Sequence, residues 1–253
     1  MFEIAPHLAL ILIGVGFVAG FVDAIAGGGG LLSVPALLLC GASPLQALAT
    51  NKVQGMVGSG TALVNYTLAG KVKPLEQLGP AAISFCCAAA GSLVAGTLPV
   101  GVLRVIMPPI LIGISVFFAV KPGLTDQLRP ARMSMRSFAL TAVPLIAGYD
   151  GFFGPGTGSF FMLALVLLTG QGVLQATAQT KLLNFASNVG SVLVFAFSGA
   201  TWWWVAAAMA LAQVIGATLG SRLAVRIGSR LIKPLLVLTS GGMALRLLWQ
   251  SFG

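Results

Sequence analysis

The sequence predicts an all-α, polytopic integral membrane protein that contains two copies of one helical unit. Three observations support this prediction: the 253 residues are 57% hydrophobic and only 8% charged, the apolar runs are long, and two polar motifs recur. Soluble domains carry about a quarter charged residues, whereas a helix crosses a bilayer with about 20 largely apolar residues. A transmembrane β-barrel would show short segments of alternating hydrophobicity instead.

Membrane segments follow one another along the chain. The long apolar runs are Leu8–Val22, Leu45–Ala69, Leu78–Leu98, Val105–Val120, Phe138–Ala147, Leu174–Ser198, Trp202–Leu219 and Pro234–Trp249. Each half begins with two segments separated by glycine: Leu8–Ala26 with Leu31–Cys40, and Phe138–Phe153 with Phe160–Thr169. At about 1.5 Å per residue, the second member of each pair is too short to span comfortably. We therefore count about five membrane segments per half, and eight spans plus re-entrant pieces are the alternative.

The second half of the chain repeats the first. A shift of 129 positions aligns GASPLQALATNK, which ends at Lys52, with GQGVLQATAQTK, which ends at Lys181. A shift of 127 positions pairs Asp23 with Asp150. Glycine and alanine are common in membrane helices, so the paired charged residues are the stronger evidence. We assign a first membrane repeat to residues 1–120, a basic linker to residues 121–136 and a second membrane repeat to residues 137–253.

Charged connections indicate how the repeats are oriented. The connection between the third and fourth segments carries Lys71 and Lys73 in the first repeat and no charge in the second. The next connection is uncharged in the first repeat and carries Arg222, Arg226 and Arg230 in the second. Cytoplasmic connections are enriched in Lys and Arg. The repeats are therefore predicted to be inverted, with the basic linker in the cytoplasm and the multi-pass chain in a bacterial cell inner membrane.

The net charge of +9 does not indicate a nucleic-acid partner. The cations lie mostly between apolar runs, and no basic patch is interleaved with exposed aromatic residues. Trp202, Trp203, Trp204 and Trp249 fall where an aromatic belt at the outer membrane interface is expected. The predicted surroundings are the lipid bilayer, and small-residue faces permit a homodimer without requiring one.

Both glycine clusters are predicted to be helix breaks that face an anionic substrate. A break inside a membrane persists only where protein, water or a ligand satisfies its backbone groups. Free N–H groups at a helix start favour an anion, and paired breaks in two repeats indicate a central site. The alternative is that these glycines only allow close helix packing. The candidate substrate-binding residues are Gly27, Gly28, Gly29, Gly30, Gly154, Gly156, Thr157 and Gly158.

A polar helical face in the second repeat adds further candidates. Its members recur at steps of four and three residues, which places them on one side of a helix: Thr177, Lys181, Asn184, Asn188 and Ser191. The corresponding first-repeat face has Lys52, with Asn51 beside it, but fewer polar groups. We expect Asn51, Lys52, Lys181, Asn184 and Asn188 to bind the substrate. The alternatives for the lysines are snorkelling to an interface or structural pairing with the aspartates.

Asp23 and Asp150 each precede a glycine break, and two roles stay open for them. They could brace the broken segments by accepting backbone or lysine hydrogen bonds, as aspartate does at helix caps. Alternatively, one of them carries a proton that is coupled to anion movement.

No catalytic, metal-binding or cofactor-binding set is predicted. The chain has one histidine, His7, five acidic residues and three cysteines without metal-ligand spacing. We therefore expect neither an enzyme nor a bound metal or cofactor.

Three stretches resemble the sulfite exporter TauE/SafE family, also called the toluene sulfonate uptake permease family. They are GFVDAIAGGGGLLSVPALLLCG (Gly20–Gly41), ALATNK (Ala47–Lys52) and GYDGFFGPGTGSF (Gly148–Phe160). The second repeat departs from this pattern, because it reads Gln-Thr-Lys where the first reads Thr-Asn-Lys. The resemblance implies secondary transport of sulfur-containing anions such as sulfite, thiosulfate or organosulfonates, with import and export both open.

The sequence as a whole therefore predicts a secondary transporter of small sulfur-containing anions. The substrate would bind at mid-membrane between the two glycine breaks, and access would alternate as one half rocks against the other. Proton coupling is an open variant of this mechanism. The competing hypotheses are an anion channel and a non-transporting membrane scaffold or assembly factor.

Overall fold

The computed structural model describes residues 4–120 and 130–228, and within these ranges the chain forms helices and no strand. The first repeat contains α1 (Pro6–Ala26), α2 (Gly29–Leu39), α3 (Pro44–Leu68), the 3-10 helix η1 (Pro74–Gln77), α4 (Leu78–Thr97) and α5 (Val100–Val120). The second contains α6 (Met135–Phe152), α7 (Thr157–Thr169), α8 (Val173–Phe195) and α9 (Trp203–Ile227). The predicted segment Pro234–Trp249 lies outside the described residues, as do Arg230 and linker positions 121–129.

The described helices have the lengths and surfaces of membrane segments. Four ranges in this part of the chain are long and apolar enough to cross a bilayer: Pro6–Ala26, Pro74–Thr97, Val100–Phe117 and Trp203–Ile227. Many of their apolar side chains face outward; Leu10 and Leu211, for example, are 69% and 71% exposed. α3 and α8 are similarly long, with 25 and 23 residues, but carry polar faces. The chain is therefore a multi-pass membrane protein.

α2 and α7 are the two short segments that the sequence predicts. They contain 11 and 13 residues, which corresponds to about 16 and 20 Å of helix. The hydrocarbon core of a bilayer is about 30 Å thick. Neither helix is therefore long enough to span this core alone, and each begins directly after a glycine break.

Positive φ angles at glycine create both breaks. α1 ends where Gly27 adopts a φ of 81° and donates its N–H to Asp23 O at 2.9 Å, and α2 begins two residues later. In the second repeat, Gly154 and Gly156 have φ angles of 94° and 84° between α6 and α7. Residues with a Cβ rarely adopt this conformation, so glycine permits both interruptions at little steric cost.

The helices pack as two groups, and each group combines both repeats. In the first group, α1 and α3 pack against α9, and α2 lies against α1 and α3. In the second group, α6 and α8 pack against α4, and α7 lies against α6 and α8. The fourth helix of each repeat therefore packs against the first and third helices of the other repeat. The main contact between the two groups joins α3 to α8.

Glycines bring the helices within each group into backbone contact. A Cβ added to Gly216 of α9 would lie 2.1 Å from the backbone oxygen of Phe17 in α1. A Cβ added to Gly91 of α4 would lie 2.2 Å from the backbone oxygen of Gly148 in α6. Atoms do not approach this closely without a shift of the backbone, so these glycines serve close helix packing.

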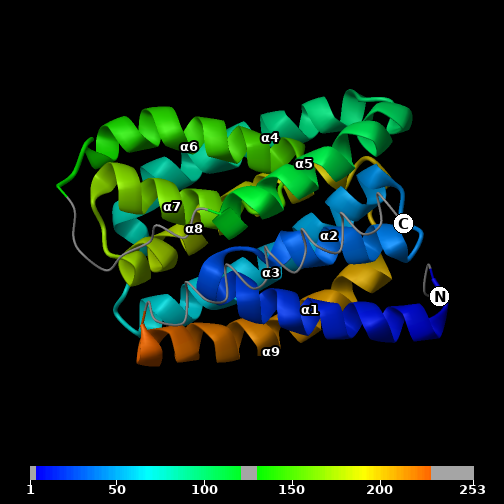
Figure 1. Ribbon diagram of the computed structural model, residues 1–253, viewed down its shortest axis with the longest axis horizontal. Coiled ribbons are helices and arrows are strands. Elements are labelled where there is room, and N and C mark those ends of the chain that lie inside the picture. The colour runs from blue at the N-terminus through cyan, green and yellow to red at the C-terminus, as the bar shows by residue number, and fades with distance from the viewer. Residues whose placement is uncertain (1–3, 121–129, 229–253) are drawn as a thin grey trace.

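Counterpart helices of the two repeats run in opposite directions in Figure 1. α1 starts at the end of the bundle that carries the N label, whereas α6 starts at the opposite end, beside the linker. α4 and α9 also run in opposite directions. An inverted duplication requires this arrangement. It stays a prediction for the whole chain, because the fifth segment of the second repeat lies outside the described residues.

Basic connections gather at one end of the bundle. The α3–α4 connection, which contains Lys71 and Lys73, lies at the end opposite the N label in Figure 1. The segment before α6, with Arg132, and the last turn of α9, with Arg226, lie at the same end. A positive-inside bias produces this kind of asymmetry.

Candidate functional site

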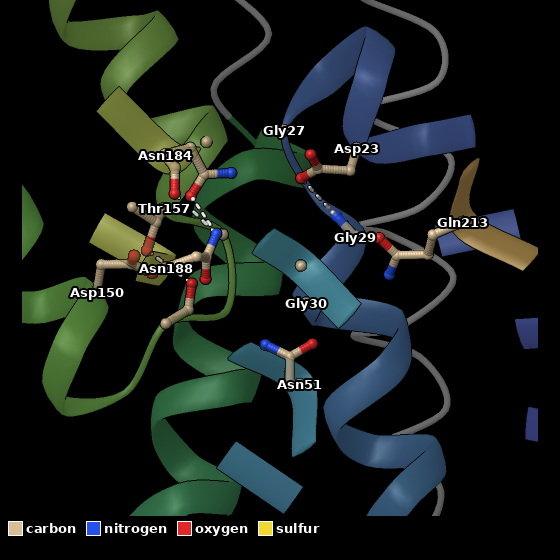
Figure 2. Close-up of a pocket in the computed structure, with 14 residues that line it drawn as sticks. Asp23, Gly27, Gly29, Gly30, Asn51, Asp150, Thr157, Asn184, Asn188 and Gln213 are labelled. Carbon is tan, nitrogen blue, oxygen red and sulfur yellow. Dashed lines mark hydrogen bonds between the residues drawn. The ribbon is translucent and has the colours of Figure 1, made fainter. Parts of the chain in front are cut away.

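A polar cavity of about 30 Å³ lies where the two helix breaks meet, between the two packing groups (Figure 2). The first group lines it with Asp23, Gly27, Gly29, Gly30, Asn51, Gly55 and Gln213, and the second with Asp150, Gly154, Gly156, Thr157, Gly158, Asn184 and Asn188. A cavity of this size holds about two water molecules. The two packing groups therefore contribute equally to one small and mainly polar chamber.

The two breaks touch each other at the cavity wall. Ser159, in the first turn of α7, donates its N–H to Gly27 O at 3.2 Å and its hydroxyl to Ala26 O at 2.7 Å. A Cβ on Gly27 would lie 2.3 Å from the carbonyl carbon of Gly158. Only a residue without a side chain fits at this crossing point.

Two helix starts border the cavity. The N-cap positions of α2 and α7 are the glycines Gly28 and Gly156, which have no side chain to cap the helix. In α2, Gly29 N–H donates to Asp23 Oδ1 at 3.4 Å, and in α7, Ser159 N–H donates to Gly27 O at 3.2 Å. Uncapped N–H groups and the helix dipole together make a helix start attractive to an anion. The backbone thus supplies hydrogen-bond donors from both repeats.

Carboxamide groups add side-chain donors to the same cavity. Asn51 Oδ1 accepts hydrogen bonds from Ser33 Oγ at 2.5 Å and from Gln54 Nε2 at 3.2 Å. Because the oxygen already has two donors, the NH₂ group of Asn51 is left to face the cavity. In the second repeat, Asn184 Oδ1 accepts from Asn188 Nδ2 at 3.4 Å, which likewise leaves the Asn184 NH₂ group available. Figure 2 shows both groups beside the cavity.

Two buried ion pairs connect the packing groups across the cavity. Lys52 Nζ lies 2.7 Å from Asp150 Oδ1, and Lys181 Nζ lies 3.2 Å from Asp23 Oδ2. Each lysine of one repeat therefore pairs with the aspartate of the other. The Lys52 side chain is 1% exposed and that of Lys181 is 0% exposed, so pairing is what allows these charges to stay inside the protein. The four charges cancel, and the cavity carries no net charge from them.

The aspartates also brace their surroundings, as one of the two sequence-based alternatives proposes. Asp23 Oδ1 accepts a long hydrogen bond from Gly29 N at 3.4 Å, which ties α1 to the start of α2. Asp150 Oδ2 accepts a hydrogen bond from Ser187 Oγ at 2.5 Å, which ties α6 to α8. This bracing does not exclude a proton-carrying role, since both carboxylates line the cavity.

Most of the predicted site residues lie together, and three of them do not line the cavity. Gly28, Lys52 and Lys181 are absent from the lining, and the lysine ammonium groups face the aspartates instead. The other predicted glycines, Thr157 and all three asparagines line it. Substrate contact by any of these residues stays a prediction.

The sequence analysis missed Gly55 and Gln213. Gly55 occupies the position that corresponds to Asn184 under the shift of 129 residues, but the comparison of the two helical faces passed over it because it has no polar side chain. Gln213 is a polar residue in the apolar first part of α9, and its Nε2 donates to Gln54 Oε1 at 2.8 Å. Its isolation in an apolar run was the available signal, but only the packing of α9 on α1 and α3 places it at the cavity.

Comparison with known proteins assigns the chain to a family. The family profile described as "Sulfite exporter TauE/SafE" matches residues 12–247. A "Probable membrane transporter protein ORF9" of Sinorhizobium sp is 50% identical over 98% of this chain and 95% of its own length. The "Probable membrane transporter protein YfcA" of Escherichia coli strain K12 is 41% identical over 100% and 94%. No solved structure matches the chain. The chain belongs to the sulfite exporter TauE/SafE family of membrane transporters.

Proposed function

We propose that this protein is a secondary transporter of small sulfur-containing anions, such as sulfite, thiosulfate or organosulfonates, in a bacterial inner membrane. The observation that carries the proposal is the polar cavity between two helix starts with glycine at the N-cap, one from each repeat. The family name supplies the substrate class. The proposed binding site is the cavity, and the proposed pathway runs along the contact between the two packing groups.

The physical argument for an anion rests on the balance of charges and donors. The two cavity carboxylates are each paired with a lysine, so an entering anion does not meet an uncompensated negative charge. It meets the N–H ends of α2 and α7 and the NH₂ groups of Asn51 and Asn184. A charge at an exposed helix start gains about 0.3–1 kcal/mol, and more in a partly buried site. Two helix starts and two amides together favour an anion over a neutral solute.

The packing suggests which parts move. A cavity with room for about two water molecules is smaller than an organosulfonate and lies between the two packing groups, so we propose that the groups separate to admit the substrate. The sequence analysis expected one repeat to rock against the other. That motion would break the glycine-mediated contacts of α1 with α9 and of α4 with α6. We therefore propose that the moving bodies are the two packing groups, with the seam between α3 and α8 as the site of movement.

We also propose transport without chemical conversion. The cavity is lined by glycines, carboxamides, one threonine and two ion-paired carboxylates, and none of these groups forms a nucleophile–base set among the described residues. The lining suits reversible binding of an anion.

Flux into proteoliposomes tests the proposed function. Purified protein should accumulate radiolabelled sulfite or thiosulfate, and Asn184→Leu should reduce the initial rate about tenfold or more, because it removes a buried hydrogen-bond donor worth about 1.5–3 kcal/mol to a charged partner. Asn65→Leu, on the surface groove beside Arg222, is the matched control and should transport normally. The absence of flux with folded wild-type protein under any imposed gradient would refute the proposal.

A further inference from the structure

The two ion pairs at the cavity are related by the duplication but differ in how firmly they are held. The Asp150 side chain is 3% exposed and lies 2.7 Å from Lys52 Nζ. The Asp23 side chain is 14% exposed and lies 3.2 Å from Lys181 Nζ. Asp23 therefore has the looser contact and the greater access to the cavity, from which a proton would arrive.

The second contacts of the carboxylates differ in the same direction. Asp150 accepts a 2.5 Å hydrogen bond from Ser187 Oγ, whereas Asp23 accepts a 3.4 Å hydrogen bond from Gly29 N. Charge-assisted hydrogen bonds are strongest when they are short. Neutralising Asp150 would therefore weaken two short contacts, and neutralising Asp23 would weaken two long ones.

The lysines respond differently to the loss of their partners. Lys181 Nζ also donates a hydrogen bond to the backbone oxygen of Asp23, so it keeps a polar partner when the carboxylate is neutral. Lys52 Nζ makes a close ion pair with Asp150, but the contact lacks hydrogen-bond angles, and no other described acceptor serves it. A buried cation without a partner is strongly destabilising. Only the Lys181 pair can thus lose its negative charge without stranding its lysine.

The other groups around Asp23 do not replace Lys181 as its partner. From α3, the Tyr66 hydroxyl donates to Ala24 O at 2.9 Å, and across the cavity the Asp150 charge of α6 is held by Lys52 of α3. The described residues of α2 and α7 carry no charge, and α9 faces the cavity with the neutral Gln213. The described α9 charges, Arg222 and Arg226, line a separate surface groove.

We propose that Asp23 is the proton-carrying group of this transporter, that Lys181 becomes the cationic contact for the anion when Asp23 is protonated, and that the Asp150–Lys52 pair stays ionised as a structural link. This inference rests on the proposed function, because it assigns the coupling within the same cavity. A proton on Asp23 leaves the buried Lys181 without its counter-charge, directly behind a carboxyl group that lines the cavity. The anion restores the balance, so proton and anion bind together and leave together.

The test is the pH dependence of thiosulfate binding to the purified full-length protein, measured by isothermal titration. Thiosulfate is the dianion of a strong acid and keeps its charge in neutral and weakly acidic buffer, so a pH dependence of its binding comes from the protein. Wild-type affinity should rise by up to about tenfold for each pH unit of acidification, because one proton is taken up with each anion. Asp23→Asn should bind with an affinity that does not change with pH.

Two controls separate coupling from structure. Asp150→Asn should lower the thermal unfolding temperature, and its folded fraction should keep the wild-type pH slope. Glu76→Gln removes an exposed carboxylate paired with Lys73. This variant should keep both the wild-type unfolding temperature and the wild-type pH slope. Retention of the wild-type pH slope in Asp23→Asn, or its loss in folded Asp150→Asn, would overturn the assignment.

A spectroscopic readout keeps this inference separable from the proposed function. On acidification, the infrared C=O band of protonated carboxyl groups should contain a component in wild type that is missing in Asp23→Asn, whether or not an anion moves. If the wild-type protein shows no flux, the proposed transport function is refuted, but the assignment of the proton to Asp23 is not. A carboxyl band that disappears in Asp150→Asn and persists in Asp23→Asn would refute the assignment of the proton.

Discussion

At the scale of single residues, the buried charges determine both stability and the character of the cavity. Lys52 and Asp150 are almost completely buried, and they join α3 of one packing group to α6 of the other. A buried ion pair contributes little net stability relative to apolar residues, but the removal of one partner leaves an uncompensated charge. The pair therefore acts mainly as a constraint on which surfaces of the two groups meet.

The substitution Lys52→Met should lower the free energy of unfolding by about 3–5 kcal/mol, because Asp150 would stay buried without its cation. The double variant Lys52→Met with Asp150→Asn should regain most of that loss. Denaturant unfolding of detergent-solubilised protein, followed by circular dichroism, measures both. Lys73→Met removes the lysine of an exposed surface pair and should leave stability unchanged. Equal stability of Lys52→Met and wild type would show that the pair does not constrain the fold.

The sequence predicts some of these residue contacts and not others. The recurrence of Asp23 and Lys52 as Asp150 and Lys181 places four charges inside apolar segments, and burial makes pairing the expected outcome. The sequence does not tell which lysine meets which aspartate. That choice depends on how the repeats pack, and the exchange of partners between repeats becomes visible only in the three-dimensional arrangement.

At the scale of helices, the glycine breaks set the geometry of the cavity. Gly27 is the point where α1 ends, where the chain adopts a positive φ and where the start of α7 passes at contact distance. A residue with a Cβ would be strained in its backbone and would clash with Gly158. Position 27 therefore requires glycine for two reasons: its own positive φ and the close approach of α7.

Gly27→Ala should be destabilised by clearly more than the about 1–2 kcal/mol that a positive φ costs an L residue, because the new Cβ would lie 2.3 Å from Gly158. Gly14→Ala, also in α1, is the matched control, since a Cβ there would meet nothing within 4 Å. It should stabilise the helix by about 0.5–1 kcal/mol. Thermal unfolding of both variants measures the difference, and an unchanged Gly27→Ala protein would contradict the contact between the breaks.

Helix existence and the positions of the breaks follow from the sequence because hydrophobic length and glycine clusters are strong local signals. The predicted short segments Leu31–Cys40 and Phe160–Thr169 correspond to α2 and α7, whose observed starts lie two and three residues earlier. The sequence does not predict which helices pack against each other. Small residues are common on many membrane helix faces, so the packing of α9 on α1 could not be read from composition.

At the scale of the whole molecule, the exchange of α4 and α9 between repeats gives the protein two bodies that are not its two sequence halves. The cavity, both buried ion pairs and the contact between the breaks all lie where these bodies meet. A transporter that binds its substrate between two bodies can expose the site to either side by moving one against the other. The account therefore depends on which helices stay together when the anion binds.

Distances between spin labels report this directly. After replacement of Cys40, Cys86 and Cys87, cysteines at lipid-facing Leu10 (α1), Leu140 (α6) and Leu211 (α9) can be labelled in pairs. Leu10 and Leu211 belong to different repeats but to one packing group, whereas Leu140 and Leu211 share a repeat but not a group. Double electron–electron resonance in lipid nanodiscs, with and without saturating thiosulfate, then compares the two distances. The account predicts that the Leu140–Leu211 distance changes on addition of thiosulfate and the Leu10–Leu211 distance does not; a changing Leu10–Leu211 distance with a constant Leu140–Leu211 distance would contradict it.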